Sequence, residues 1–384
     1  MNDGRESGVA VTTYDFGAFR FGIEHEFPAL DGSGRFVDFE TATFEELDRV
    51  IADLPEHPED ATSLRTGDLG IKAKRWYIEG FERFGENGEY LRTDPKGFEI
   101  RTPICASLPE AIDNLNESIA LWDKAAAVYG YTSLSCALNP FRDEFVPNPP
   151  LNEWEVADRD TPEEQTAYIH MLTYGPDISF SHPDFTAEKT IDIARKLTFY
   201  SPLIVPYSFT SPFYKGEPWG GLSRRTFYRT GQRPAVLVFT DDPSLIEESF
   251  PSLVEPARIP SEAGRIEFKA FDCVPAVGMY RALGTLLVGL ALDETLLGRA
   301  TVPSAELHQL AATEALESES ILSGAREVLA AAREALPEGE RRYLAPLEGM
   351  LQTKMTFAHT MLRTFGKELA SGVEKEAAIL KAIR

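Results

Sequence analysis

Two glutamates near the start of the chain are the residues whose types and spacing are most suggestive of chemistry. They lie in the segment Phe21-Gly22-Ile23-Glu24-His25-Glu26-Phe27. Its alternation of side chains predicts a β-strand, in which every second residue points to the same face. Glu24 and Glu26 then share one face, and the other face carries Ile23, His25 and Phe27. An acidic face opposite an apolar one indicates a functional site.

The same pattern recurs twice further along the chain. Glu99 shares a predicted strand face with Arg101, and Glu267 lies between Arg265 and Lys269. If these strands belong to one sheet, the glutamates converge, and ionised carboxylates brought together repel and need cations. Oxygen ligands suit Mg²⁺ or Mn²⁺. Any one of these glutamates alone would be an ordinary solvent-facing residue of an antiparallel strand. The repetition favours a metal site.

A second cluster of charge lies between Trp219 and Pro234. This short stretch of a strongly acidic chain contains Arg224, Arg225, Arg229 and Arg233. Guanidinium groups bind phosphate or carboxylate in bidentate geometry, and a nucleotide or an acyl phosphate would be a suitable ligand. The alternative is that these arginines only neutralise surface acids. The sequence contains no Walker-type or G-x-G-x-x-G loop that would offer a different phosphate site.

Overall charge and hydropathy exclude some partners. Among 384 residues, 38 are Lys or Arg and 61 are Asp or Glu, which gives a net charge of −23. Such a chain is a poor partner for nucleic acid or an anionic membrane. The N-terminus is polar, and the apolar stretch Ala282–Leu292 is too short to span a bilayer, so we expect a cytoplasmic protein. Three well-separated cysteines without metal-type spacing predict buried, reduced thiols: Cys105, Cys136 and Cys273.

Local sequence signals predict the elements that position these residues. Capping boxes predict helix starts at Thr43–Glu46, Ser107–Glu110 and Thr161–Glu164, the second helix running to Gly130. Asn87-Gly88 predicts a tight turn, and further strands are expected at Tyr131–Leu138 and Ala235–Thr240. The Pro-rich, polar stretches Leu54–Thr66 and Pro140–Pro162 are expected to be surface loops. Residues Pro275–Arg384 have helical periodicity.

Strands and helices are mixed without a strict βαβ rhythm, which predicts an α+β fold. We expect a curved antiparallel sheet that carries the active site, packed against helices, with a helical C-terminal part. We expect a single catalytic domain over residues 1–384, with a flexible N-terminus at 1–17, a mixed core at 18–275 and a helical layer at 276–384. The helical tail is either such a layer or a dimerising element, so the sequence leaves open whether the protein forms a homo-oligomer.

Taken together, these motifs resemble the glutamate-cysteine ligases of the carboxylate-amine ligase type, within the glutamine synthetase-like superfamily. No single motif is decisive, but their order is preserved over about residues 20 to 275. The matching segments are Gly22–Phe27, Glu99–Cys105, Thr210–Gly216, Ser223–Arg225 and Arg265–Asp272.

The resemblance implies an ATP-dependent ligase that phosphorylates the γ-carboxylate of glutamate and lets an amine displace the phosphate. The amine would be the amino group of cysteine or of another amino acid, and ATP would be a co-substrate. The resemblance implies that Mg²⁺ (or Mn²⁺) is bound by Glu24, Glu26, Glu99 and Glu267. Arg225 would contact phosphate or a substrate carboxylate, with Arg229 as a second catalytic arginine. The candidate substrate-binding or nucleotide-binding residues are Arg101, Asp177, Ser179, Arg224, Arg233 and Lys269.

The chain departs from the pattern of the family in two places. The family commonly carries a His-x-His strand where this chain has Asp177 and Ser179. Asp177 can still offer a hard oxygen ligand to a metal. Lys269 stands where the family usually has arginine, so a point charge replaces a bidentate fork, which favours a changed substrate.

Two alternatives keep the scaffold but change the function. One is a guanidino kinase-like enzyme or a ligase for another carboxylate, and the other is a catalytically silent binding or regulatory homologue. Retention of all four glutamates argues against silence. The base that deprotonates the amine cannot be assigned from sequence. His25, His170 and His182 are candidates, although a single histidine is more often structural, and His182 falls on the strand face opposite Asp177.

Overall fold

A computed structural model describes residues 14–58, 60 and 74–384. Within these residues the main sheet has seven strands, and all neighbouring strands are antiparallel except the first two in the order given next. Across the sheet the order is β10 (Val254–Pro256), β9 (Val236–Thr240), β11 (Ile266–Phe268), β6 (Pro176–Ser181), β1 (Arg20–Phe27), β4 (Tyr90–Arg101) and β3 (Trp76–Phe84). The predicted α+β class is confirmed, with a curved sheet that is mixed rather than wholly antiparallel.

The register of β1 brings the acidic residues together. Glu26 lies opposite Glu99 of β4, and Glu24 lies opposite Asp177 of β6. On the next strand, Glu267 lies opposite Ser179 of β6. Residues opposite one another on paired strands point to the same face. One face of the sheet therefore collects acidic side chains from four strands.

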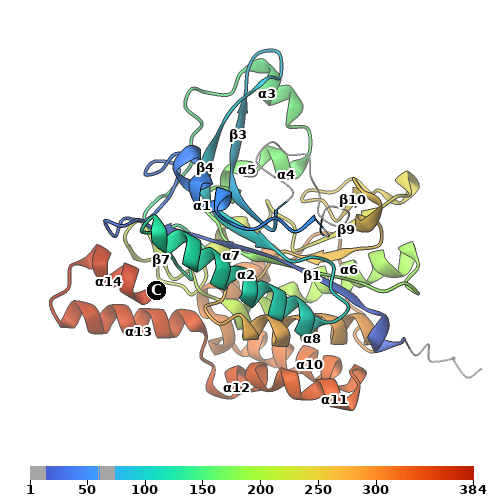
Figure 1. The fold of residues 1–384 in the computed structure, drawn as a ribbon. Coiled ribbons are helices and arrows are strands. Elements are labelled where there is room, and N and C mark those ends of the chain that lie inside the picture. Colours follow the sequence, from blue (N-terminus) through green and yellow to red (C-terminus); the bar gives the residue numbers. More distant parts are fainter. Residues whose placement is uncertain (1–13, 59, 61–73) are drawn as a thin grey trace, which may run out of the picture.

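The opposite face of the sheet is apolar and buried under helices. Ile23, Ile100, Ile178 and Phe268 on this face are at most 1% exposed. The helices α2 (Leu108–Val128), α6 (Ala187–Ile204) and α8 (Gly278–Leu292) pack against it, and α2 and α8 lie below the sheet in Figure 1. In α8, a Cβ on Gly289 would lie 2.7 Å from the carbonyl oxygen of Ala332, so glycine allows close packing on α10 (Glu319–Ala335).

The C-terminal region is helical, as predicted. Beyond α8 the described chain forms α9 (Ala305–Glu314), α10 (Glu319–Ala335), α11 (Glu338–Arg341), α12 (Ala345–Thr353), α13 (Phe357–Ala370) and α14 (Lys375–Ala382). Buried side chains from α8, α10 and α12 belong to the same hydrophobic core as the strands of the sheet, so the helices form a layer on it. Figure 1 shows α13 and α14 side by side at one end of this layer.

An arm extends from the sheet where β3 and β4 continue beyond the other strands toward α3 (Glu153–Asp158) in Figure 1. The predicted Asn87-Gly88 turn joins the two strands, and Gly88 has φ +80°, a conformation that favours glycine. Arg83 and Glu155 form a buried ion pair of 2.7 Å that fastens the arm to α3.

The predicted helix starts are confirmed. Capping boxes form at Thr43 of α1 (Phe44–Ala52) and at Thr161 of the single-turn α4 (Pro162–Gln165). Ser107 caps α2, although Glu110 accepts from Ala106 rather than closing the box on Ser107. The remaining helices are α5 (Ala167–His170) and α7 (Arg224–Arg229), and two small sheets pair β2 (Ala29–Leu30) with β5 (Thr132–Ser133) and β7 (Phe213–Tyr214) with β8 (Glu217–Pro218).

Two local predictions are wrong in part. The strand expected at Tyr131–Leu138 is reduced to β5, because the backbone after it bonds to several separate segments: Leu134 donates to Pro28 and Ser135 to Ile383. The loop expected at Pro140–Pro162 contains α3, which begins at a box made by Asn152 and Glu155. Asparagine in place of serine or threonine made this box easy to overlook.

Two predicted segments extend beyond the described residues. Residues 1–13 of the expected flexible N-terminus, and residues 59 and 61–66 of the expected loop Leu54–Thr66, lie outside the described residues.

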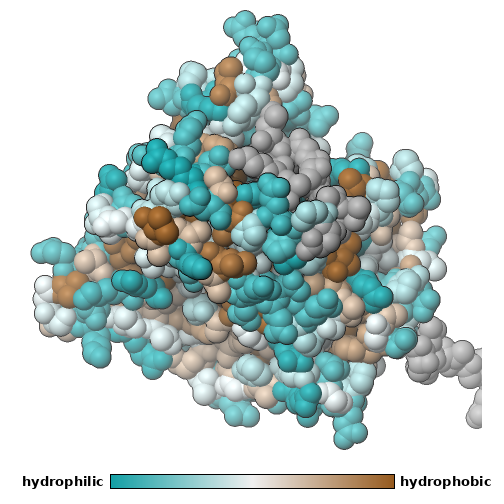
Figure 2. All heavy atoms as spheres, viewed as in Figure 1, coloured by the Kyte–Doolittle hydropathy of each residue, from teal (hydrophilic) through white to brown (hydrophobic). Residues whose placement is uncertain are grey.

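The three cysteines are buried free thiols, as predicted. None of the helices in the described ranges is long and apolar enough to cross a membrane. Figure 2 shows one face covered mainly by hydrophilic residues, with hydrophobic ones in small separate groups.

Candidate active site

A cavity of about 330 Å³ lies over the acidic face of the sheet. Every strand of the main sheet contributes side chains to it, because alternate residues of each strand point to this face. Arg225 and Arg229 of α7 line another wall. Six of these strands supply carboxyl groups, so the cavity combines acidic and cationic walls.

The first acidic group consists of Glu24, Asp177 and Glu267, which offer carboxylate oxygens within 4.8 Å of one another. Lys269 contacts both Asp177 and Glu267, its Nζ lying 2.6 Å from Glu267 Oε1. Arg265 lies 3.0 Å from Glu267 and 3.9 Å from Glu24. Three acids therefore face two cationic side chains in this part of the described structure, and negative charge remains in excess.

The excess of negative charge falls on Glu24. Burial and the nearby carboxylates of Glu267 and Asp177 raise the pKa of Glu24 to about 7. Glu267 behaves in the opposite way: burial alone would raise its pKa, but Lys269 and Arg265 lower it to about 2. A further cation near Glu24 would favour its ionised form.

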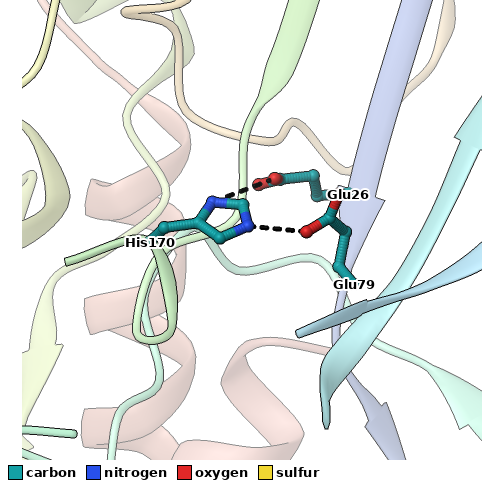
Figure 3. Close-up of side chains that lie close together, drawn as sticks. All are labelled: Glu26, Glu79 and His170. Atoms are coloured by element: carbon teal, nitrogen blue, oxygen red, sulfur yellow. Dashed lines mark hydrogen bonds and ion pairs between the residues drawn. The ribbon is translucent and has the colours of Figure 1, made fainter. Parts of the chain in front are cut away.

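The second acidic group consists of Glu26, Glu79 and His170 (Figure 3). His170 lies between the two carboxylates, with Nε2 2.6 Å from Glu79 and Nδ1 3.6 Å from Glu26. Lys96, a fully buried residue, donates to Glu26 over 2.8 Å. Although burial opposes it, Lys96 and His170 lower the pKa of Glu26.

Glu99 lines the same cavity but lies outside both groups of closest ligand atoms. It is only 3% exposed and contacts Glu79. Burial, Glu79 and Glu24 raise the pKa of Glu99 well above its ordinary value. Glu99 therefore favours its protonated form, whereas His170 lowers the pKa of the neighbouring Glu79 despite its burial.

The arginine wall is held by backbone carbonyls rather than by acids. Arg225 donates to the carbonyl oxygens of Ala270 and Lys269 over 3.2 and 3.1 Å, and its nearest carboxylate, Asp272, is 3.8 Å away. Arg229 also donates to Lys269 O. Burial, Arg225 and Arg233 lower the pKa of Arg229. Cations gathered in this way favour an anionic ligand.

The wider relationships of the chain are consistent with this site. Residues 20–244 match the family model of glutamate-cysteine ligase family 2 (GCS2). The chain belongs to glutamate-cysteine ligase family 2. A curated relative, "Putative glutamate--cysteine ligase 2" of Thermobifida fusca (strain YX), is 27% identical over 219 residues. That match covers 50% of this chain and 51% of the relative, so it spans about half the length of each.

Solved structures share the fold of this family member at low sequence identity. A glutamate-cysteine ligase from Francisella tularensis, solved with AMP, has a TM-score of 0.54 and 8% identity, covering 97% of this chain and 89% of its own. A bifunctional glutathione synthetase from Pasteurella multocida has a TM-score of 0.53 and 13% identity, covering 96% and 52%. At such identities the likeness concerns the fold alone.

Most of the residues singled out from the sequence line the cavity of this glutamate-cysteine ligase family member. They are Glu24, Glu26, Glu99, Arg101, Asp177, Ser179, Arg225, Arg229, Arg233, Glu267 and Lys269. The four glutamates do not form a single cluster, because Glu24 and Glu267 belong to the first group and Glu26 to the second. Arg101 donates to the carbonyl of Lys74 and lies 5.2 Å from the ring of Tyr77.

Arg224 is not among the residues that line the main cavity. Neighbouring residues of a helix point about 100° apart, whereas residues four apart share a face. Arg225 and Arg229 of α7 therefore face the cavity together, and Arg224 packs elsewhere, 4.5 Å from the ring of Tyr214 and 5.1 Å from that of Phe227.

The three candidate histidines lie in different surroundings. His25 is buried on the helix-covered face and pairs with the hydroxyl of Tyr280 at 2.9 Å; burial lowers its pKa to about 4. His182 is 4% exposed and bonds to Asp15 O and Asp184 N, which confirms it as structural. His170 lies in the second acidic group.

Sequence reasoning missed several residues of the cavity, of which Glu79 is the most informative. In β3, Tyr77 and Glu79 share the cavity face while Trp76 and Ile78 are buried opposite. The alternation that pointed to Glu24 would have pointed here as well. Glu163 and Glu255 were also missed, because the single-turn α4 and the short β10 carry too few residues for a periodic pattern.

The donor atoms fit the expected metal ions. The first group offers only carboxylate oxygens, which Mg²⁺ and Mn²⁺ prefer, and the ionised form of Glu24 lacks a full counter-charge. In the second group His170 adds a nitrogen, which Mn²⁺ accepts more readily than Mg²⁺. Lys269 and Lys96 already form ion pairs with carboxylates of these groups and would compete with a metal ion for them.

Proposed function

We propose that this protein is an ATP-dependent ligase that activates the γ-carboxylate of glutamate as an acyl phosphate and joins it to an amine. The amine proposed is the amino group of cysteine or of another amino acid. One observation carries the proposal. Two groups of acidic residues line a single cavity together with Arg225 and Arg229, and neither arginine has a carboxylate within 3.5 Å among the described residues. Family membership supports the same reaction.

Phosphoryl transfer needs neutralisation of negative charge more than it needs covalent chemistry from the protein. We propose that Glu24, Asp177 and Glu267 hold one divalent cation, and that Glu26 and Glu79 hold a second with His170. Magnesium, when bound, would draw electron density from the phosphate oxygens of ATP. Arg225 and Arg229 would bind the phosphoryl group as it moves, since their guanidinium groups already lie in the wall.

In the first step, a γ-carboxylate oxygen of glutamate attacks the γ-phosphorus of ATP, and the bond to the β-phosphate oxygen breaks to release ADP. In the second step, the amine nitrogen attacks the acyl carbon, phosphate leaves, and the nitrogen loses one proton. His170 lines the cavity, but it lies between Glu26 and Glu79 and we assign it no proton transfer. The chain's part is alignment and electrostatics.

An ADP-release screen tests this function. The full chain is incubated with Mg²⁺, ATP, glutamate and a panel of amino acids and amines, and each product is identified by mass spectrometry. We expect stoichiometric ADP, phosphate and a γ-glutamyl amide. A phosphorylated product that keeps the phosphoryl group would support the kinase-like alternative instead. No ADP release with any carboxylate and amine would contradict the proposal and favour a silent homologue.

A further inference from the structure

A pair of carboxyl groups at one end of the cavity plays no part in the two acidic groups already described. Glu163 of α4 and Glu255 of β10 both line the cavity. Burial and the neighbouring carboxyl group of Glu163 raise the pKa of Glu255 to about 7. Both oxygens of Glu163 are buried, and neither accepts a hydrogen bond from a donor in the described part of the chain. Such a pair needs a shared proton or a cation between its members.

Two arginines lie near this pair, but neither has a carboxylate of the pair as its hydrogen-bond acceptor among the described residues. Arg233 donates to the backbone carbonyl of Glu163 over 2.6 Å, not to its carboxylate. The Nε of Arg233 is buried and has no acceptor among the described residues. Arg258 lies near Glu255, but its guanidinium is engaged by Glu262 at 3.3 Å. The cations at this end of the cavity therefore do not neutralise the pair, and some of their donors are available.

A second observation points to a ligand in the same cavity. Arg225 is only 2% exposed and lines the cavity, yet its buried Nε meets no acceptor within the described ranges. Unsatisfied buried donors and unsatisfied buried acceptors thus occur in one cavity. Beside the pair, a ligand that carries both a cationic donor and an anionic acceptor would satisfy Glu163 and the neighbouring Arg233.

The number of ligand atoms distinguishes an ammonium group from a metal ion. Each of the two acidic groups that fit a metal offers three ligand residues, whereas Glu163 and Glu255 are two and belong to neither group. Two carboxylates are few for a divalent cation, which takes about six ligands. A primary ammonium has three donors and suits two carboxylates. Arginine nearby suits a carboxylate on the same molecule.

We propose that Glu163 and Glu255 form a subsite for the ammonium group of an amino-acid substrate, with Arg233 binding the carboxylate of the same molecule. This inference rests on the proposed ligase function for its substrate class, since both the donor glutamate and an amino-acid acceptor carry these two groups. It adds a requirement to that function: amines without a carboxylate, and carboxylic acids without an amine, bind poorly.

Binding to the full chain by isothermal titration calorimetry tests the subsite without requiring turnover. The titrations are made with Mg²⁺ and a non-hydrolysable ATP analogue present. The probes are L-cysteine, its desamino analogue 3-mercaptopropionate and its decarboxylated analogue cysteamine, together with L-glutamate and glutarate. In the wild-type protein we expect cysteine or glutamate to bind at least about tenfold more tightly than its desamino analogue, because a charge-assisted hydrogen bond is lost.

The variant Glu163→Gln/Glu255→Gln should weaken binding of that amino acid by about tenfold or more and leave binding of the ATP analogue unchanged. Loss for cysteine alone assigns the subsite to the acceptor, and loss for glutamate alone assigns it to the donor. Glu248→Gln is the matched control, since Glu248 is exposed and does not line the cavity. Thermal unfolding checks that each variant is folded.

Two results would overturn the inference. One is unchanged binding of both amino acids in the folded double variant. The other is wild-type protein that binds each amino acid no more tightly than its desamino analogue, a result that does not depend on any variant folding. The subsite and the ligase reaction can be rejected separately. If amino-acid binding depends on the pair but the ADP-release screen yields no amide product, the subsite is supported and the reaction is rejected.

Discussion

At the scale of single residues, the most consequential feature is that the acids of the cavity do not share one environment. Burial and neighbouring acids raise the pKa of Glu24 to about 7, whereas Lys269 and Arg265 overcome burial and lower that of Glu267 to about 2. The same strand pattern in the sequence thus leads to opposite electrostatic states. The difference comes from cations that neighbouring strands supply, which a pattern within one strand does not contain.

Glu24→Gln should lower turnover by about 100-fold or more, because a neutral amide is a poor ligand for a divalent cation and changes to outer partners alone cost about 10–100-fold. The fold should persist, since Glu24 is 32% exposed and its ion pair with Arg265, within the described part of the chain, is long at 3.9 Å. Steady-state kinetics across a range of Mg²⁺ concentrations check this. Glu117→Gln, an exposed change on α2, is the control. Near-normal rates at limiting Mg²⁺ would contradict the assignment of Glu24 as a metal ligand.

Lys269→Gln should increase the affinity for Mn²⁺ by about tenfold while lowering turnover. The ammonium contacts both Asp177 and Glu267, so its removal leaves these carboxylates without their closest counter-charge and frees them for a metal. Mn²⁺ titration followed by electron paramagnetic resonance measures the change. Lys124→Gln on the exposed face of α2 should have no effect. Weaker Mn²⁺ binding in Lys269→Gln would show that the lysine supports the metal rather than competing with it.

At the scale of elements, the arm formed by β3 and β4 is positioned by a few contacts that can be tested one at a time. Its turn needs Gly88, and its side is fastened to α3 through Arg83 and Glu155. The turn was predictable from the Asn-Gly pair, whereas the ion pair joins residues 72 positions apart and depends on the tertiary fold. Because β3 carries Glu79 into the cavity, the arm also contributes to the site.

Gly88→Ala should lower the free energy of unfolding by about 2–3 kcal/mol, from a left-handed backbone and a steric clash. A Cβ at this position would lie 2.7 Å from the ring of Trp154. Gly34→Ala is the matched control, because Gly34 has a similar φ of +82° and a Cβ there would have no neighbour within 4 Å. We expect it to cost only about 1–2 kcal/mol. Equal losses in urea unfolding would show that Trp154 imposes no constraint.

Glu155→Gln should destabilise the protein by about 3 kcal/mol at pH 7, since it breaks a buried ion pair. Burial would raise the pKa of Glu155, but bonds from Arg83, Asn152 and Phe84 lower it to about 2, below its ordinary value of 4.5. The ionised carboxylate therefore stabilises the fold above about pH 4.5, and this stability is lost as the pH falls toward 2.

Urea unfolding of wild type and Glu155→Gln at pH 7, 4 and 3 should show the difference in free energy shrinking as the pH falls. The exposed Glu153→Gln in the same helix is the control, for which a small and nearly constant difference is expected. A difference for Glu155→Gln that stays constant with pH would mean that shape, not charge, accounts for the loss.

At the scale of the whole molecule, the sequence predicted the sheet, its acidic face and the helical layer, because all three depend on periodic patterns. It did not predict the separation of the glutamates into two groups, which follows from the register of β1 between β4 and β6. It also did not predict the turning of Arg224 away from the cavity, which depends on where α7 begins. The single catalytic domain stays a prediction, supported by a hydrophobic core that runs from Phe19 to Ala358.

The central claim is that two separate groups of side chains on one sheet face hold divalent cations beside a triphosphate. The most direct measurement is a crystal structure of the full chain grown with Mn²⁺ and a non-hydrolysable ATP analogue, with anomalous scattering recorded for manganese. We predict one anomalous peak among Glu24, Asp177 and Glu267, a second beside Glu26 and Glu79, and phosphate density between these peaks and Arg225. A bound nucleotide with no manganese at either group would contradict the account.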